Sequence, residues 1–525
     1  MGKNKRIEID DFAGGMVSAG SKYRLARNQT LSCKNMYWLD EVGALIGMYG
    51  TQSFNNTGLE TADFQGFDRL YPTGNTAVFL AAINKILYRG STSANIAPVL
   101  DVAANLNGAT GDLYFAFHND IAYFCYGNST DKMCSVGRTG DWSPDVASDN
   151  SDPYLITWWN DRMWIMETGD QLKGSEIRKP TIFGTPPGFD RAIGENDNQI
   201  ATAIVGYRQY LLIFKKARIY VLTGNNPYEY NVQVLSKSVG CTSPRSIVEY
   251  EDRLYFWDDN GMHTLSGLTL DYRKDGRTRP LTWAVKNIVK SISATYRPKI
   301  ASGIFRNFLK IAFKDPDIAG GYNNNQIVID LETERVCCTT PGIAASMYVT
   351  QDGTGDAGEL FHASSKGDGK IYQQEIGYNY EALENGTGGT AIPSLWLSRP
   401  LPPRPGMTIH DCIKILLEGF TGGSDMTVKI YVDTAANPVF TGTLIFTVAD
   451  GTGKKLVEQG ETSDDDLEFD TDFLAEVTWG TGAIMPIASN ATCSFQIEFS
   501  HEVLGHRPEL RRAVVEHSET EQDIA

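Results

Sequence analysis

The sequence predicts an all-β protein built around a β-propeller of about six or seven blades, and two observations lead to this prediction. From about residue 60 to 380, short apolar runs rich in Tyr, Ile, Val, Phe and Trp alternate with Gly, Asn and Asp clusters, which is typical of successive strands. A hairpin motif also recurs there every 40 to 50 residues or so, the length of a four-stranded blade. Helical periodicity is scarce, and the best candidate, Trp283–Ile292, covers at most three turns.

Length and charge limit the classes of protein that this chain resembles. Its 525 residues exceed one ordinary core, so two or three domains are expected. The net charge of −17 has the wrong sign for a protein that grips nucleic acid by its phosphates. An acidic surface would suit DNA that slides past without binding. Acidity that serves solubility alone is the plainer interpretation.

Residues 1–55 are expected to form an N-terminal arm. The segment has basic residues but no apolar core of a signal peptide, and no run of about 18 apolar residues occurs anywhere in the chain. The eight cysteines are scattered without a C-x-x-C pair, so we expect buried thiols rather than a zinc site or a disulfide framework.

Residues 56–390 are expected to form the propeller. Each copy of the motif has an aromatic or aliphatic strand end, a polar two-residue turn and an alternating strand. The copies begin at Ile83, Phe117, Trp159, Tyr207, Tyr250 and Phe305. The middle steps are 42, 48 and 43 residues long, whereas the outer ones are 34 and 55. The alternative is a pair of β-sandwiches with accidental hairpin similarity.

Residues 391–525 are expected to form a β-sandwich or jelly-roll-like domain. A glycine-rich linker over residues 384–393 and the proline segment Arg399–Pro405 precede it. Strands are predicted at Ile413–Leu417, Met426–Val432, Thr443–Val448 and Cys493–Phe499, before a frayed acidic tail from Glu516 to Ala525.

Three segments come close to known chemical motifs without matching them. In His501–His506 (HEVLGH) the second histidine comes one residue too late for a zinc-binding helix. Asp450–Lys455 (DGTGKK) lacks the first glycine and the Ser or Thr of a phosphate loop. The acidic run Asp464–Asp466 lacks the glycine and spacing of a calcium loop. We expect a hairpin turn and a solvated surface in the last two.

We therefore predict no catalytic, cofactor-binding or metal-binding residues, no cofactor and no enzymatic activity. A propeller glycosidase would need two carboxylates that flank one bond, and a sequence with 64 acidic residues cannot single them out. The histidines His118, His263 and His362 are interpreted as packing or surface residues.

The arm carries the most specific motifs in the chain. They are Ile9–Val17 (IDDFAGGMV), Asn28-Gln29, Cys33–Met36 (CKNM) and Gly43–Gly50 (GALIGMYG). Gly14-Gly15 permits positive φ in a turn, and Gly43 could open a hairpin. Together the motifs resemble the start of a broad set of bacteriophage tail structural proteins, although Met48 stands where those proteins usually have arginine. Pro508–Glu516 resembles their closing strand, and Arg218–Gly224 and Leu254–His263 resemble their repeat.

The nearest group by this resemblance is the podovirus tail nozzle, or head–tail stabilisation, family. The resemblance implies a sixfold ring below the portal and adaptor, with fibres or tip proteins beneath it and DNA leaving through it. It also implies assembly in the host cytoplasm and a final place in the virion. We therefore expect a structural component of the nozzle or head–tail junction, which lines part of the DNA exit channel and docks its neighbours.

Two alternatives remain open. In the first, the chain is a receptor-binding or fibre-attachment protein whose C-terminal domain binds a host sugar or a fibre, with Trp396 and Trp479, if exposed, as sugar platforms. In the second, it is a propeller hydrolase that acts on cell-surface glycans.

Overall fold

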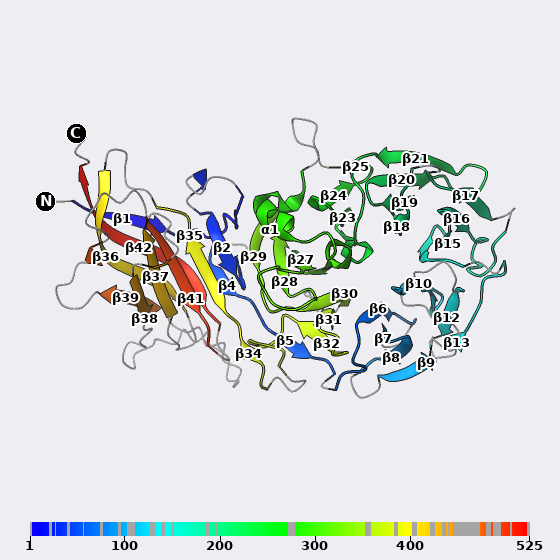
Figure 1. The fold of residues 1–525 in the computed structure, drawn as a ribbon, viewed down its shortest axis with the longest axis horizontal. Coiled ribbons are helices and arrows are strands. Elements are labelled where there is room, and N and C mark those ends of the chain that lie inside the picture. Colours follow the sequence, from blue (N-terminus) through cyan, green and yellow to red (C-terminus); the bar gives the residue numbers. More distant parts are fainter. Residues whose placement is uncertain are drawn as a thin grey trace, which may run out of the picture.

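Strands make up almost all the regular structure of this chain in the computed structural model (Figure 1). The structure describes residues 3–19, 24–26, 28–38, 43–55, 57–73, 77–92, 96–101, 111–126, 132–137, 142–149, 152–184, 188–194, 197–270, 279–351, 359–382, 387–401, 407–420, 426–432, 437–438, 440–444, 473–478, 485–486, 495–503 and 507–521. Within these residues no helix is long and apolar enough to cross a membrane.

Six four-stranded antiparallel sheets and the first four strands of a nine-stranded sheet form the seven blades of a β-propeller, which confirms the predicted fold class. In the blades whose first strand Figure 1 labels, that strand lies towards the centre of the ring and the later strands lie towards its rim. Blades 1 to 3 are β6 (Phe64–Leu70), β7 (Val78–Ile83), β8 (Ile86–Gly90), β9 (Ala97–Asp101); β10 (Tyr114–His118), β11 (Ile121–Cys125), β12 (Cys134–Gly137), β13 (Trp142–Ser143); and β14 (Leu155–Trp159), β15 (Arg162–Glu167), β16 (Gln171–Gly174), β17 (Phe189–Ala192).

The remaining blades continue in chain order, except that the last one takes a strand from the arm. Blades 4 to 7 are β18 (Ala201–Tyr207), β19 (Tyr210–Lys215), β20 (Arg218–Thr223), β21 (Asn231–Ser236); β22 (Val248–Tyr250), β23 (Arg253–Asp258), β24 (Gly261–Ser266), β25 (Thr269–Leu270); β26 (Ala301–Phe305), β27 (Phe308–Phe313), β28 (Asn325–Asp330), β29 (Arg335–Thr339); and β30 (Ala345–Gln351), β31 (Glu359–Ser364), β32 (Ile371–Gln374), β5 (Thr51–Ser53).

Apolar side chains fill the interfaces between neighbouring blades. Leu80 of blade 1 and Phe124 of blade 2 belong to one buried cluster, and Phe214 of blade 4 and Phe256 of blade 5 belong to another. Full burial of one such side chain stabilises the fold by about 1.5–3 kcal/mol. Each blade is therefore held by its neighbours, as repeat architectures require.

The recurring sequence motif is the hairpin between the first two strands of blades 2 to 6. The two turn residues have φ near +50° to +60° in three of these hairpins: Asn119 and Asp120, Asn160 and Asp161, and Glu251 and Asp252. Two consecutive positive φ angles define the tight turn that matches strand twist, and Asn and Asp tolerate them well.

The outer copies of the motif deviate for two separate reasons. The Ile83 hairpin joins β7 to β8, the second and third strands of blade 1, so its assignment to the same position as the other copies was wrong. In blade 1 the first strand, β6, ends at Leu70 and the second, β7, begins at Val78, so they are not separated by two residues as in the other copies. The long step before Phe305 contains an insertion with η5 (Leu281–Val285), α1 (Lys286–Ser291) and η6 (Arg297–Lys299), so the predicted short helix is present as one α-helical turn and its 3₁₀ extension.

The strand β5 closes the propeller from the other end of the sequence. Thr51, Gln52 and Ser53 pair with β32 as the outermost strand of blade 7. Asn55 fixes this strand end, because its side-chain oxygen accepts the N–H of Ile371 at 2.6 Å and its amide donates to the Gly369 carbonyl at 3.2 Å. The first and last parts of the propeller thus share one sheet.

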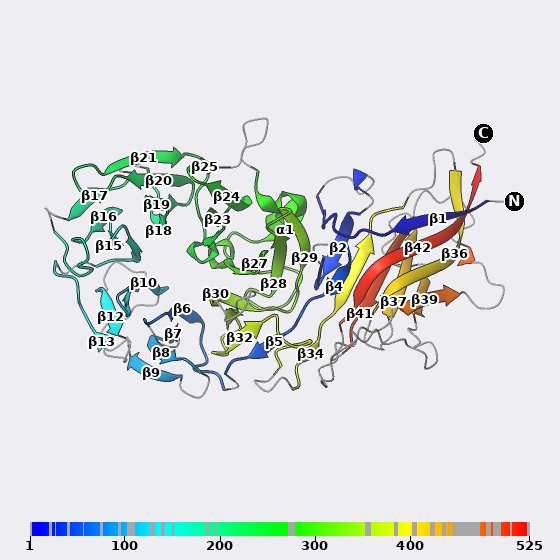
Figure 2. The ribbon, with the colours of Figure 1, turned by 180° about the vertical axis from the view of Figure 1, so that it is seen from behind.

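Two further sheets form the β-sandwich beside the propeller (Figure 2). One continues blade 6 through β2 (Thr30–Lys34), β35 (Ser394–Ser398), β41 (Phe495–His501), β37 (Met426–Val432) and β38 (Phe440–Leu444). The other contains β1 (Lys3–Ile9), β3 (Met36–Trp38), β4 (Leu45–Gly47), β36 (Met407–Phe420), β39 (Phe473–Thr478), β40 (Met485–Pro486) and β42 (Glu509–Glu521). A small separate ladder joins β33 (Asn379–Tyr380) and β34 (Thr390–Ala391).

A single apolar core joins the propeller to the sandwich. It contains Phe313 and Val328 of blade 6, Trp396 and Phe499 of the extended sheet, and Leu510 of the opposite sheet, all buried. Since one sheet and one core run through both parts, we expect them to behave mechanically as one body.

Asn35 is a polar hub of this junction. It is fully buried with φ near +54°. Its side-chain amide donates to the Pro393 carbonyl at 2.8 Å, its side-chain oxygen accepts the Tyr380 hydroxyl at 2.5 Å, and its backbone N–H donates to the Thr339 carbonyl at 2.9 Å. The arm, blade 6, the small β33–β34 ladder and the segment before β35 therefore meet at one residue.

The arm motifs fold against one another beside this hub. The side chain of Asp11 accepts the Asn28 amide at 2.7 Å, and a Cβ atom on Gly43 would lie 3.2 Å from the Asp11 carboxylate. A Cβ atom on Gly14 would lie 2.3 Å from the Asn28 carbonyl oxygen, so no other residue fits there without movement. Of the pair Gly14-Gly15, Gly15 has a positive φ of +82°, and Gly43, just before β4, has a φ of +66°.

Candidate functional site: the axial cavity of the propeller

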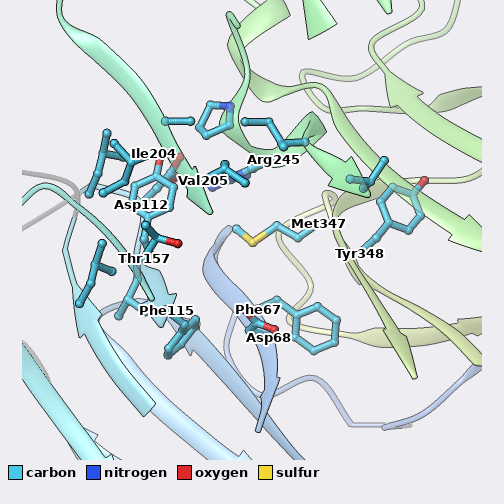
Figure 3. A pocket seen from close by; sticks show the side chains of 18 of the residues that line it. Phe67, Asp68, Asp112, Phe115, Thr157, Ile204, Val205, Arg245, Met347 and Tyr348 are labelled. Atoms are coloured by element: carbon cyan, nitrogen blue, oxygen red, sulfur yellow. Dashed lines mark hydrogen bonds and ion pairs between the residues drawn. The ribbon is translucent and has the colours of Figure 1, made fainter. Parts of the chain in front are cut away.

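A cavity of about 410 Å³ lies on the propeller axis, and every blade contributes to its wall. The wall is formed by the inner strands β6, β10, β14, β18, β22, β26 and β30, together with the short 3₁₀ turn η4 (Pro244–Ser246). Most of the side chains are apolar, among them Phe67, Phe115, Ile204 and Met347 (Figure 3). Polar atoms nevertheless contribute more than half of the exposed surface, so the cavity combines apolar side chains with a polar surface.

One ion pair crosses the cavity wall from blade 2 to blade 5. A guanidinium nitrogen of Arg245, on η4, contacts the Asp112 carboxylate, which precedes β10 (Figure 3). The Arg245 side chain is 14% exposed and that of Asp112 is 42% exposed, so the pair lies at the edge of the chamber. The two opposite charges largely neutralise each other towards a ligand.

Asp68 is the second carboxylate of the chamber. It projects from β6 of blade 1 and, within the described part of the chain, forms no ion pair at 4.0 Å or less. Burial raises the pKa of Asp68 to about 7, although the Arg69 backbone N–H, which donates to the carboxylate at 2.7 Å, favours the charged form. The Asp68 carboxyl group is therefore about half protonated at neutral pH.

Ser302, Tyr348 and Tyr114 are among the lining residues that carry hydroxyl groups. Ser302 is 3% exposed, and its Oγ has no hydrogen-bond partner among the described residues. The Tyr348 hydroxyl accepts the Gln326 amide at 2.5 Å, and burial, the main cause, raises the pKa values of Tyr348 and Tyr114 well above that of free tyrosine. Both phenols are therefore neutral at any physiological pH.

The histidines and the first tryptophan of the sequence analysis lie outside this cavity. His118 stacks on Trp158 with ring centroids 3.9 Å apart. His362 is buried beside Gln374, and burial lowers its pKa to about 3. Trp396 is 2% exposed and packs edge-on against Phe12, so it cannot serve as a sugar platform.

The other sequence candidates are placed as follows. His501 is buried at the end of β41. Trp479, the acidic run Asp464–Asp466 and the segment Asp450–Lys455 lie outside the described residues. Among the residues that the structure does describe, no three His, Cys, Asp or Glu side chains are arranged to hold a metal ion.

Sequence analysis missed Asp68, Arg245 and Ser302 because each belongs to a different blade. A signal existed for Asp68 alone, since it is an acidic residue inside the otherwise apolar and aromatic strand FQGFDRL. The convergence of seven inner strands depends on the closed ring, which no local pattern specifies.

Comparison with known proteins adds little beyond the fold. No protein-family model and no curated protein matches the chain. Among solved structures, the N-terminal domain of Nup159 is 12% identical, with a TM-score of 0.37, over 66% of this chain and 96% of its own. Virginiamycin B lyase from Staphylococcus aureus is 13% identical, with a TM-score of 0.38, over 62% of this chain and 99% of its own. PorZ of Porphyromonas gingivalis is 10% identical, with a TM-score of 0.36, over 69% of this chain and 44% of its own.

Proposed function

We propose that this chain is a non-enzymatic structural component of a bacteriophage tail, a subunit of the nozzle or head–tail junction ring. In this role it lines part of the DNA exit channel and docks neighbouring tail proteins above and below. The ring order of six and the placement in the virion come from the resemblance of the arm and closing strand to podovirus nozzle proteins.

The observation that carries the proposal is the convergence of the motifs on which that resemblance rests. Leu45 of the arm pairs with Leu510 of the closing strand, and the Gly47 N–H donates to the Pro508 carbonyl at 2.7 Å. Motifs from opposite ends of the sequence therefore form one structural unit. The other two matching segments, Arg218–Gly224 and Leu254–His263, lie apart from this unit in blades 4 and 5 of the propeller.

The architecture suits a ring subunit for a separate reason. One sheet and one core join the propeller to the sandwich, so a copy of this chain can pack as a single body against its neighbours in a closed ring. The net charge of −17 suits a lumen that repels phosphates. The axial cavity, at about 410 Å³, accommodates a small molecule rather than a duplex. In this proposal DNA passes between subunits and not through a propeller.

Electron microscopy of the purified protein and of virions with a tag on this chain tests the proposal. We expect a ring with a central channel, labelled at the tail below the head. A monomer or trimer labelled at fibre tips would contradict the nozzle role and favour receptor binding, which glycan arrays would then test. Turnover of a cell-surface glycan by the purified chain would support a hydrolase instead.

A further inference from the structure

We propose that the axial cavity of the propeller binds a small organic cation, an ammonium group on an apolar body, with its charge against the Asp68 carboxylate. This inference goes beyond a structural role in a tail and does not depend on it. It rests on the charge, the wall and the size of the cavity.

Asp68 is the residue that favours a cation. Burial makes its unpaired carboxylate costly to ionise, and a cation placed beside it lowers that cost. The other charged groups in the wall, Asp112 and Arg245, already pair with each other. Asp68 is thus the one carboxylate in the described wall that a ligand can neutralise, and an anionic ligand would meet a cation that is already paired.

The wall favours an organic cation over a metal ion. Phe115 and Phe67 lie on blades 2 and 1, and Met347 projects towards the chamber from blade 7 (Figure 3). Aromatic faces and polarizable thioethers attract organic cations and apolar groups, whereas Mg²⁺ and Ca²⁺ need several oxygen ligands.

The size of the cavity also suits an organic ligand. The volume of about 410 Å³ lies within the range for small-molecule pockets.

The proposal predicts a definite dependence on pH. The ammonium ligand needs the charged carboxylate, so binding near neutral pH must release the Asp68 proton. The other titratable groups of the described wall are the phenols Tyr114 and Tyr348, which are neutral at physiological pH, and Asp112 and Arg245, which form an ion pair. Since burial raises the pKa of Asp68 to about 7, affinity should be constant above pH 8 and fall about tenfold per pH unit well below 7.

Isothermal titration of the full chain with three matched probes tests the proposal. The probes are 2-phenylethylamine, 2-phenylethanol and 3-phenylpropanoate, which share an aromatic body and differ in charge. We expect the amine to bind at least about tenfold more tightly than the other two at pH 8. Titrations at pH 7 in two buffers of different ionisation enthalpy should reveal proton release on binding of the amine.

Two variants locate the cation. Asp68→Asn keeps the shape of the side chain and should weaken amine binding by roughly tenfold or more while abolishing its pH dependence. Asp112→Asn, in the same wall, should leave both nearly unchanged. Tighter binding of the propanoate, equal binding of amine and alcohol, or no measurable binding of any probe would overturn the proposal. These wild-type results decide the matter even if Asp68→Asn fails to fold.

Discussion

Lys215 is a buried cation whose surroundings satisfy all of its hydrogen bonds. The side chain has 0% exposure and its ammonium contacts Asp170 at 2.6 Å and Asp197 at 3.0 Å, as well as the carbonyls of Ile193 and Gln199. Burial alone would raise the pKa of Asp197, but hydrogen bonds from Lys215 and its other neighbours outweigh it and hold the pKa below its usual range. The sequence at the end of β19 contains two consecutive lysines, and no pattern reveals which of them is buried.

Lys215→Met should therefore lower the free energy of unfolding by about 3–5 kcal/mol, because it leaves two carboxylates buried without a cation. The adjacent Lys216, which is 66% exposed, provides the matched control, and Lys216→Met should change stability by less than about 0.5 kcal/mol. Equilibrium denaturation by urea measures both. Equal effects of the two substitutions would contradict the assignment of Lys215 as the buried partner.

The blades were largely predictable from sequence because their hairpins carry local signals. Polar turn residues between alternating strands identified blades 2 to 6. Blade 1 was misplaced by one strand because more than two residues separate its first two strands, which therefore lack the two-residue signal. The sequence did not predict that β5 belongs to blade 7, because pairing between strands far apart in the chain produces no periodic pattern of residues.

Asn55→Ala tests how firmly β5 closes the ring. The substitution leaves the buried Ile371 N–H without its acceptor, so we expect a loss of about 1–3 kcal/mol in the free energy of unfolding. Hydrogen exchange should accelerate most at the amides of β32, next to β5. Asn231→Ala, at an exposed position on the rim strand β21, should leave both quantities unchanged. Acceleration spread evenly over all blades would argue against a local closing role.

At the scale of the whole molecule, the propeller and the sandwich share a sheet and a core, although the sequence predicts a domain boundary between them. The composition break near residue 390 suggests a boundary, yet one sheet runs from blade 6 through β2 and β35 into the sandwich. The axial cavity likewise appears only when all seven blades close, which explains why its residues could not be chosen from local motifs.

We therefore expect a single cooperative transition for the propeller and the sandwich in scanning calorimetry of the isolated chain. The physical reason is that unfolding either part would expose the core that both share. Two well-separated transitions would show that the shared sheet does not couple them. Fluorescence of the tryptophans, followed in parallel, should change with the same midpoint.

The strand β5, which completes blade 7, also has a consequence for synthesis on the ribosome. It is synthesised early, but its partner β32 follows more than 300 residues later. The strand β1 likewise pairs with β42, which is synthesised later still. At about 5–20 residues per second, the interval between β5 and β32 lasts roughly 15 to 60 s. Throughout that time the nascent arm carries strands with no partner, so an early release of the polypeptide or a premature stop would leave an open ring with free edges, which is the form most prone to aggregate.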